Sequence, residues 1–289
     1  MMALPPMLSI ALMGLLGLLV GSFLNVVIYR LPIMLQARWT AECKALMAEE
    51  STNAGTAGDD ALRFNLLVPR SRCPHCEHPI AWFENIPLLS YVLLRGRCRQ
   101  CHAPIGLRYP LVELACGLLF AACAWQWGAT ATGLAHAGLC AALLTAALID
   151  WDTTLLPDDL TLPLLWAGLV LAALHITPVN LSDALWGAVA GYVALWLVFW
   201  AFKLATGKEG MGYGDFKLLA ALGAWLGWQA LVPVVLLSSI IGALIGLALK
   251  ARGGLREGGY VPFGPFLAGA GLVTLGIGPH TVLALFGLG

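Results

Sequence analysis

The stretch Met7–Tyr29, MLSIALMGLLGLLVGSFLNVVIY, is a continuous run without a charged side chain. A membrane-spanning α-helix needs about 20 consecutive apolar residues, because the hydrocarbon core of a bilayer is about 30 Å thick. The run is too long for the apolar part of a cleaved signal peptide, and it lacks the basic start and small-residue cleavage site of such peptides. We therefore expect it to form a retained membrane-spanning helix.

Similar apolar runs recur along the chain, which has 289 residues, 60% of them hydrophobic and 11% charged. A soluble domain carries about 25% charged residues, and the mean hydropathy here is +0.83. The composition predicts an all-α membrane protein, a bundle of about eight transmembrane helices that contact the lipid bilayer. We expect these helices near residues 7–29, 111–127, 133–149, 160–176, 184–202, 217–229, 230–249 and 264–287.

Basic residues are unevenly distributed along the chain. Of the 16 Lys and Arg residues, ten lie between Arg30 and Arg108, and none occurs from Tyr109 to Phe202. With the eight spans above, every basic residue falls on one side of the membrane. Lys and Arg favour the cytoplasmic side, so we expect both termini outside the cytoplasm. The formal net charge is zero, which gives no indication of a nucleic-acid partner.

The spans divide the chain into three predicted regions: a first transmembrane helix at 1–29, a cytoplasmic region at 30–110, and a membrane-embedded domain at 111–289. Within the cytoplasmic region, the stretch AEESTNAGTAGDDA at 48–61 is small and acidic. Such a composition cannot bury enough apolar surface to fold, and it predicts a mobile linker before a compact unit that contains cysteines.

Four of the eight cysteines form two repeated motifs, CPHCEHPI and CRQCHAPI, which contain Cys73, Cys76, Cys98 and Cys101. Four thiolates at tetrahedral corners suit Zn²⁺ and leave no open coordination position, so we expect a structural, zinc-ribbon-like site. Two disulfides are the alternative, but a reducing cytoplasm disfavours them. Further alternative ligands are His75, His78 and His102. The remaining cysteines are interpreted as buried or unpaired residues: Cys43, Cys116, Cys123 and Cys140.

Four acidic residues crowd into the stretch IDWDTTLLPDD at 149–159, which contains no basic residue. Asp158 or Asp159 follows a proline and precedes an apolar run, so either residue can be a helix N-cap or part of a site. Asp150 ends an apolar run, at a helix C-terminus, where the helix dipole disfavours a negative charge. Ionisable residues at membrane spans are functional candidates, and Asp150 has no evident structural role.

A second candidate is Asp215 in the stretch GMGYGDFK, which precedes another apolar run. Asp215 can cap the following helix with Lys217 as a counter-charge, and Asp183 is interpreted as an ordinary N-cap. However, Asp150 and Asp215 both lie at predicted cytoplasmic ends of spans, where a bundle can bring their carboxylates together. Two close carboxylates share a proton, and such a pair can activate water and protonate a leaving group.

The glycines beside Asp215 support the same interpretation. Gly212 and Gly214 carry no Cβ, so the backbone there can approach an extended peptide substrate closely. A GxGD motif beside a membrane span, with a second aspartate at a membrane edge 65 residues earlier, is more specific than the motif alone.

Taken together, these motifs resemble the type IV prepilin peptidases, which are bifunctional leader peptidases and N-methyltransferases of bacterial inner membranes. The resemblance covers almost the whole chain. It rests on the paired CxxC motifs and on five stretches, GSFLNVVIYRLP, FENIPLLSY, RYPLVEL, IDWDTTLLPDDLTLP and GMGYGDFKLLAALGAWLG. It implies cleavage of the leader of prepilins and pseudopilins on the cytoplasmic side by an aspartic peptidase in 111–289. Its catalytic pair would be Asp150 and Asp215, with Asp152 or Asp158 tuning the pair or orienting the substrate.

The resemblance also implies methylation of the new N-terminal residue with S-adenosylmethionine as the methyl donor. No Rossmann fingerprint is present, and the resemblance places this activity near the first cytoplasmic region. The candidate residues are Gly21, Asn25, Arg30, Glu84 and Glu113. Helix packing at Gly21, topology anchoring at Arg30, and favourable placement of Glu113 at a helix N-terminus are the structural alternatives.

Two other functions remain open from the sequence. One is a GxGD membrane protease without methyltransferase activity. The other is a non-enzymatic assembly factor or transporter whose acids line an ion path. Many transporters contain inverted repeats with helices broken at mid-membrane, whereas the acids here cluster at one predicted membrane edge.

Overall fold

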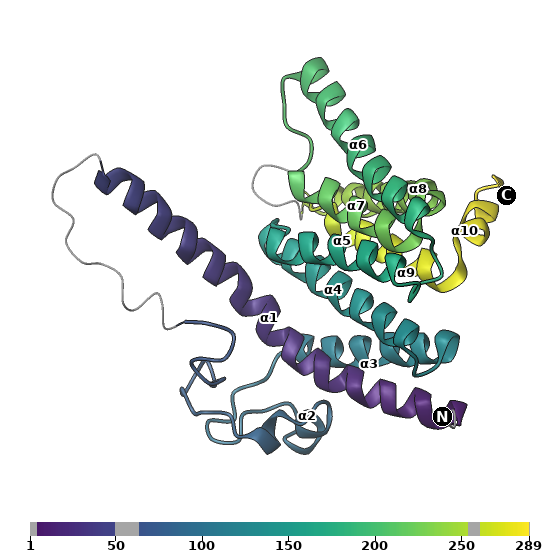
Figure 1. Ribbon diagram of the computed structural model, residues 1–289. Coiled ribbons are helices and arrows are strands. Elements are labelled where there is room, and N and C mark those ends of the chain that lie inside the picture. The colour runs from purple at the N-terminus through teal and green to yellow at the C-terminus, as the bar shows by residue number, and fades with distance from the viewer. Residues whose placement is uncertain (1–4, 50–63, 254–260, 289) are drawn as a thin grey trace. The chain divides into compact units, whose positions relative to one another are not determined.

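The computed structural model describes residues 5–49, 64–253 and 261–288, and in these ranges the extended regular elements are all helices (Figure 1). The predicted all-α fold is therefore confirmed. The chain divides into two compact units, one formed by Ala11–Ala121 and the other by Met1–Ile10 with Ala122–Gly289. The predicted linker at 48–61 lies, apart from its first two residues, outside the described residues.

The unit Ala11–Ala121 contains most of α1 (Pro6–Glu49) and most of α3 (Arg108–Trp127). Helix α1 does not end near Tyr29. It continues through Pro32 to Glu49 and is 44 residues long in total. A helix of that length extends about 66 Å, roughly twice the thickness of a bilayer core. The residues after Pro32 include many Ala, Leu, Met, Gln, Lys and Glu, which favour the helix. The membrane span and the helix are thus not the same segment.

Glycines let α1 and α3 approach each other closely. A Cβ on Gly17 would lie 2.7 Å from the carbonyl oxygen of Cys116, and a Cβ on Gly21 would lie 2.8 Å from Cα of Glu113. Small residues at such crossings are typical of helix pairs in membranes. The packing interpretation of Gly21 is therefore the one that its contacts support.

In the sequence, the 3₁₀-helix η2 (Trp82–Asn85) and the short helix α2 (Leu89–Leu93) follow α1 and precede α3.

The second unit contains seven further α-helices and one 3₁₀-helix among its described residues (Figure 1). In chain order these are α4 (Ala131–Thr153), α5 (Asp158–Ala173), α6 (Leu181–Thr206), α7 (Tyr213–Leu226), η3 (Trp228–Ala230), α8 (Leu231–Ala251), α9 (Gly264–Ile277) and α10 (Pro279–Leu285).

Helix α7 forms the centre of the second unit, where it contacts α5, α6 and α9. Its residues from Leu218 to Trp225 are all buried, and they contribute much of the apolar core. A Cβ on Gly187 of α6 would meet the carbonyl oxygen of Gly223 in α7, and the reverse also holds. The absence of both side chains lets the two backbones touch, which brings α7 deep into the helix bundle.

Five helices of the described residues are long and apolar enough to span a membrane, namely α1, α3, α4, α6 and the segment that includes α8. Helices α9 and α10 make a sixth if they count as one span, although they are bent by 108° at the break between them. Each of the eight predicted segments contains a helix, but among the described residues at most six candidate spans are found rather than eight. Helix α5 has 16 residues and α7 has 14, about 24 and 21 Å, which is shorter than the bilayer core.

The helix caps differ from the prediction. The N-cap of α6 is Asn180, whose side chain accepts from the N–H of Asp183 at 2.8 Å. Asp183 instead accepts from the indole N–H of Trp228. Pro157 occupies the N-cap position of α5, so Asp158 and Asp159 lie inside its first turn. The N-cap interpretations of these aspartates were wrong because each helix begins before the acidic residue.

Candidate functional site

Asp150 and Asp215 lie at the ends of two helices of the second unit. Asp150 lies in the last turn of α4 and Asp215 in the first turn of α7. Both side chains are buried, with exposed fractions of 5% and 3%. They are close enough that the charge of Asp150 contributes to raising the pKa of Asp215. The fold thus brings together two acids that are 65 residues apart in the sequence.

The carboxylate of Asp150 is held by the start of α9. Its Oδ2 accepts from the main-chain N–H of Gly264 at 3.0 Å, the first residue of that helix. A Cβ at position 264 would lie 2.6 Å from the same oxygen, so only glycine fits this contact. Free N–H groups and the positive end of the helix dipole at an N-terminus both suit an ionised carboxylate.

Asp215 has different surroundings, although it lies beside Asp150. Helix α7 is too short to count among the candidate spans, and Asp215 lies in its first turn. Burial and the charge of Asp150 raise the pKa of Asp215 to about 7, against the opposing effect of a main-chain hydrogen bond with Gly212. Its Oδ1 is buried without a hydrogen-bond partner. An unpartnered buried oxygen favours the protonated acid, because burial penalises the charged form.

Aromatic rings fix the first turn of α7 around Asp215. The ring of Phe199 in α6 lies 5.2 Å from that of Tyr213 and 5.7 Å from that of Phe216, measured between centroids. Phe199 and Phe216 are almost fully buried. Tilted and edge-on ring pairs of this kind stabilise packing beyond the area that they bury. Asp215 is therefore held on a rigid turn rather than on a free loop.

The two glycines of the GxGD motif have different surroundings. A Cβ on Gly214 would lie 2.5 Å from Cβ of Leu156, whereas a Cβ on Gly212 would have only the main-chain N of Gly214 within 4 Å. Gly214 thus allows the connection between α4 and α5 to approach Asp215. Gly212 retains the open space that the close approach of a substrate backbone requires.

The other acids of the stretch at 149–159 do not belong to the buried pair. Both oxygens of Asp158 accept from Nζ of Lys217, at 2.6 and 2.7 Å. Lys217 therefore neutralises Asp158 across α5 and α7 and is not the counter-charge of Asp215. Asp152 is exposed in the last turn of α4.

The four motif cysteines converge in the first unit. Their Sγ atoms all lie within 4.8 Å of one another, with 3.8 Å between those of Cys73 and Cys101 and 4.0 Å between those of Cys76 and Cys98. A tetrahedral site with Zn–S bonds of about 2.3 Å has edges of about 3.8 Å. The thiols are free rather than disulfide-bonded. This group could hold a metal ion, and it includes none of the three nearby histidines.

The repeated sequence motifs fold into repeated structures. The N–H of Cys73 donates to the carbonyl of His78, and that of Cys98 donates to the carbonyl of Ala103, both at 2.9 Å. The main-chain N–H groups of His75 and Cys76 lower the pKa of the Cys73 thiol to about 7. The main-chain N–H groups of Cys101 and Gln100 likewise lower the pKa of the Cys98 thiol. Each CxxC motif thus directs main-chain N–H groups at its first sulfur, which favours the thiolate form.

The five methyl-transfer candidates all lie in the first unit. Gly21 packs against Glu113. Oε2 of Glu113 accepts from the N–H of Leu88 at 2.9 Å, and Nδ2 of Asn25 donates to the carbonyl of Tyr109 at 3.1 Å. These contacts tie α1 and the cysteine-containing segment to α3.

Arg30 is a buried connector rather than an exposed anchor. Its guanidinium donates to the carbonyl oxygens of Asn65 at 2.8 Å and Pro69 at 2.6 Å. Its Cζ also lies 5.5 Å from the centre of the Phe64 ring, a cation–π distance. Arg30 thus holds the segment that leads into the cysteine motifs against α1.

Glu84 forms a small charged cluster beside the cysteine motifs. Its Oε2 accepts from the N–H of Ala81 at 3.0 Å and lies 3.4 Å from Nε2 of His78, while Oε1 lies 3.5 Å from the guanidinium of Arg99. The bond from Ala81, followed by the attraction of His78, lowers the pKa of Glu84. The cluster joins the two cysteine repeats to η2.

One site residue, Gly264, was missed in the sequence, and it contacts Asp150. Lys217 was expected beside Asp215 but neutralises Asp158. The only local signal for Gly264 was its place before Pro265, a pair that is typical of a helix start. No local signal identifies which carboxylate lies beside it, because that carboxylate is 114 residues away in the sequence.

Comparison with known proteins identifies two matching family models. A model described as the bacterial peptidase A24 N-terminal domain matches residues 15–127. A model described as the type IV leader peptidase family matches residues 137–247. Each of the two compact units thus contains most of one match. No solved structure matches the chain.

Curated relatives match almost the whole chain, and the three described here all carry the name prepilin leader peptidase/N-methyltransferase. The Burkholderia pseudomallei (strain 1026b) protein is 54% identical over 99% of this chain and 91% of its own length. The Stutzerimonas stutzeri protein is 54% identical over 90% and 88%, and that of Pseudomonas aeruginosa is 53% identical over 90% and 88%. With this identity over nearly its full length, the chain belongs to the type IV leader peptidase family.

Proposed function

We propose that this multi-pass membrane protein cleaves the leader of prepilins and pseudopilins and then N-methylates the new N-terminal residue. The observation that carries the peptidase assignment is the buried pair of Asp150 and Asp215, whose two carboxyls have unlike surroundings. Two carboxyls whose environments separate their protonation states are suited to act as base and acid. The names of the relatives support the substrate class and the methyl transfer.

In this mechanism Asp150, bound by Gly264, is the ionised base, and Asp215 is the acid. Asp150 takes a proton from a water molecule while the water oxygen bonds to the scissile carbonyl carbon. Asp215 gives its proton to the carbonyl oxygen, which produces a neutral tetrahedral diol. The C–N bond then breaks as Asp150 protonates the leaving nitrogen and a diol hydroxyl returns a proton to Asp215. Both carboxyls regain their starting states.

Asp158 has a supporting role in this proposal. Its pairing with Lys217 fixes the start of α5 to α7, the helix that carries Asp215. Asp152 lies in the same turn of α4 as Asp150 and is proposed to orient the substrate at the exposed edge of the site. Open space at Gly212 would admit the extended substrate backbone.

The four motif cysteines are proposed to hold Zn²⁺, because their sulfur spacing fits the edges of a tetrahedral zinc site. Four protein ligands close the coordination sphere, so the metal would stabilise the fold of the first unit and not take part in cleavage. The name of the relatives implies S-adenosylmethionine as the methyl donor. The five candidate residues for methyl transfer hold the first unit together through internal contacts, and we assign none of them a step in that reaction.

The proposed location is the bacterial inner membrane, with the carboxylate pair facing the cytoplasm. The support is the concentration of Lys and Arg in the polar segments, which favours a cytoplasmic side for them. The leader of the substrate would then remain in the cytoplasm, and the apolar stem of the substrate would lie among the helices and lipid.

A processing assay in membranes tests this function. A prepilin-like substrate is incubated with the wild-type protein, Asp150→Asn or Asp215→Asn, and the products are weighed by mass spectrometry. We expect the wild type to release the leader and, with S-adenosylmethionine, to add one methyl group, whereas each variant inserts but does not cleave. An intact substrate with the wild-type protein over a range of pH would contradict the proposal. Cleavage without the methyl group would limit it to a peptidase.

A further inference from the structure

Helix α2 in the first unit has an exposed apolar face. The side chains of Leu89, Val92 and Leu93 are 52%, 70% and 72% exposed. These residues are three and four positions apart, so they lie on one face of the helix. On another face Ser90 is buried, and its hydroxyl donates to the carbonyl oxygen of Phe83 at 2.8 Å. The apolar face therefore belongs to a segment that internal contacts hold in place.

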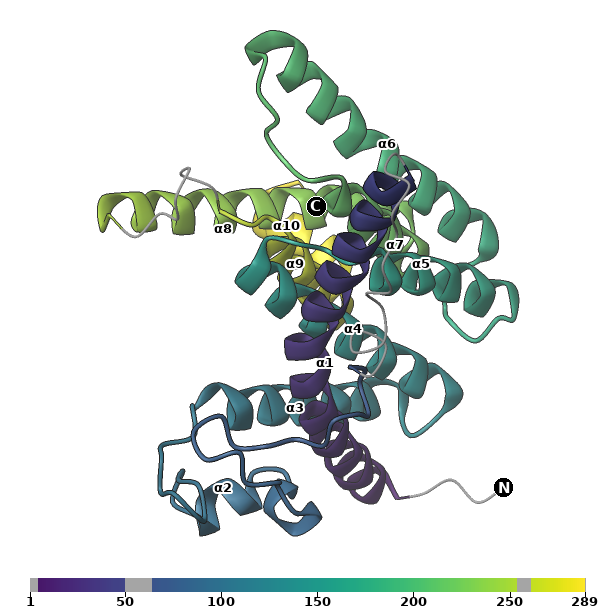
Figure 2. The ribbon, with the colours of Figure 1, turned by 90° about the vertical axis from the view of Figure 1, so that its left-hand side faces the viewer.

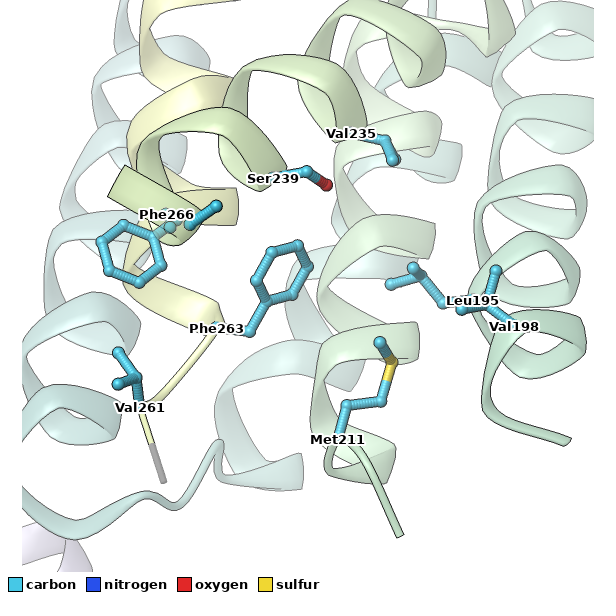
Figure 3. Close-up of a pocket in the computed structure, with 10 residues that line it drawn as sticks. Leu195, Val198, Met211, Val235, Ser239, Val261, Phe263 and Phe266 are labelled. Atoms are coloured by element: carbon cyan, nitrogen blue, oxygen red, sulfur yellow. The ribbon is translucent and has the colours of Figure 1, made fainter. Parts of the chain in front are cut away.

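Exposed apolar side chains are expected on membrane spans, but α2 is not part of one. Helices α6 and α8 are candidate spans, and a cavity of about 420 Å³ lies between them and the beginning of α9 (Figure 3). Of the side chains labelled there, Ser239 alone is polar. Helix α2 has five residues and belongs to no candidate span among the residues that the structure describes. The apolar face of α2 thus requires a separate explanation.

The contacts between α1 and α3 fix the position of α2 along the membrane spans. The two helices are antiparallel, because a Cβ on Gly21 would lie 2.8 Å from Cα of Glu113, while Asn25 donates to the carbonyl oxygen of Tyr109. Gly21 lies in the uncharged run of α1, so Glu113 is level with an apolar part of that helix. The N-cap residue of α2, Leu88, donates its N–H to Oε2 of Glu113 at 2.9 Å. Helix α2 therefore begins close to the level of the apolar run.

The depth of α2 is that of a helix in a membrane interface. Figure 2 shows α2 alongside the first turns of α3, and Figure 1 agrees. Helix α3 begins at Arg108, and Glu113 lies about 7.5 Å further along the helix axis. Interfacial helices bury their apolar faces about 5–10 Å into the boundary between headgroups and acyl chains. The apolar face of α2 is thus at a level where lipid can cover it.

The charged side chains near α2 in the sequence are all basic. From Asn85 to Val112 the chain contains four arginines and no Asp or Glu. Arg95 and Arg97 follow α2 closely, and both are exposed, as is Arg108. Basic residues close to a membrane surface are attracted to anionic lipids. An anionic bilayer surface offers an apolar layer to the helix and negative charge to the arginines, at the level that α3 sets.

We propose that α2 inserts its apolar face into the lipid interface and that Arg95, Arg97 and Arg108 bind anionic lipid headgroups beside it. The cysteine-containing segment would then rest on the membrane instead of extending into solvent. This inference requires that α1 and α3 span the membrane, and it is independent of the proposed cleavage and methyl transfer.

Photocrosslinking of the full-length protein in vesicles tests this assignment. Benzoylphenylalanine replaces Val92 or Leu93, whose exposure leaves room for the photoreactive ring. The matched control has the same label at Leu46, which is 68% exposed and lies on α1 about 38 Å along the helix axis from Gly21. The vesicles contain phosphatidylcholine alone or a mixture with phosphatidylglycerol. Membrane insertion of each protein is verified first, and the adducts are then identified by mass spectrometry.

We expect lipid adducts with the label at Val92 or Leu93. The label at Leu46 should give at least about tenfold fewer, because it lies beyond the interfacial depth of about 5–10 Å. Adducts of Val92 and Leu93 with protein instead of lipid would show that another part of this chain or a second copy covers α2, and would overturn the inference. Equal lipid adducts at Leu46 would also overturn it.

The arginines are tested in the same assay. Each arginine near an anionic surface favours binding by about fivefold, so Arg95→Gln combined with Arg97→Gln should lower the lipid adducts at Val92 by at least about fivefold in the vesicles with phosphatidylglycerol. The same double variant should have little effect in phosphatidylcholine alone. Equal yields in both kinds of vesicle, with and without the two arginines, would overturn the binding of anionic headgroups.

Discussion

The main-chain N–H of Gly264 donates to Oδ2 of Asp150 at 3.0 Å, across a sequence separation of 114 residues. This contact joins the N-terminus of α9 to the last turn of α4 and orients one carboxyl of the buried pair. It has little tolerance, because a Cβ at position 264 would lie 2.6 Å from the same oxygen.

Gly264→Ala should therefore reduce leader cleavage strongly. The added methyl group must displace the carboxyl of Asp150, and a misplacement of about 1 Å can lower a catalytic rate by about 10²-fold. Gly269→Ala is the matched control, because it lies on the same helix and a Cβ there meets no atom within 4 Å. Equal cleavage rates for the two variants would show that the contact with Gly264 does not position the base.

Cleavage should depend on pH through Asp215. Burial and the neighbouring Asp150 raise the pKa of this group to about 7, so its proton is lost as the pH rises through that value. If Asp215 is the acid, kcat/KM should fall about tenfold per pH unit above the pKa. The measurement is a pH profile of kcat/KM from pH 5 to 9. A rate that rises throughout this range would reverse the roles of the two carboxyls.

The same shift predicts how stability varies with pH. The folded protein keeps a proton on Asp215 between the ordinary value of 3.8 and about 7, whereas the unfolded chain does not. The contribution to stability is therefore complete below about pH 4 and is lost as the pH rises to 7. Asp215→Asn removes this dependence, so it should raise the melting temperature in detergent more at pH 8 than at pH 5. A similar change at both pH values would show that Asp215 is not protonated in the folded protein.

The pair of Asp158 and Lys217 should contribute little to catalysis. Asp158 has a half-exposed side chain, and exposed ion pairs stabilise by about 0 to 1 kcal/mol. We expect Asp158→Asn and Lys217→Met to retain cleavage within a few-fold and to change the melting temperature slightly and non-additively. The comparison uses the two single variants, the double variant and Asp150→Asn. A loss with Asp158→Asn as large as that with Asp150→Asn would place Asp158 among the catalytic groups.

Removal of a motif cysteine should remove the metal. Cys73→Ser replaces one of four converging sulfurs, so we expect purified protein to lose bound zinc and its first unit to become more sensitive to proteolysis. Cys43→Ser is the control, because Cys43 is exposed and lies outside the group. Metal content is measured by atomic spectrometry. Wild-type protein without zinc, or Cys73→Ser with an undiminished content, would contradict the metal assignment.

Features that depend on local composition and spacing could be predicted from the sequence. Apolar runs predict helices because a bilayer core excludes unpaired backbone groups, and each of the eight predicted segments contains a helix. The repeated CxxC motifs predict that four sulfur atoms converge, because each motif is a local turn. The four sulfur atoms do converge. Asp150 and Asp215 were expected to meet because Asp150 follows one apolar segment and Asp215 precedes another, both on one predicted side.

The distant groups that meet at the site could not be predicted from the sequence. The short helix α7 lies at the centre because Gly187 and Gly223 let two backbones touch, and no hydropathy pattern reports that contact. Lys217 pairs with Asp158 rather than with Asp215, and Gly264 binds Asp150. These contacts join residues that are 59 and 114 positions apart. They depend on how the helices pack against one another, whereas hydropathy and spacing describe each segment alone.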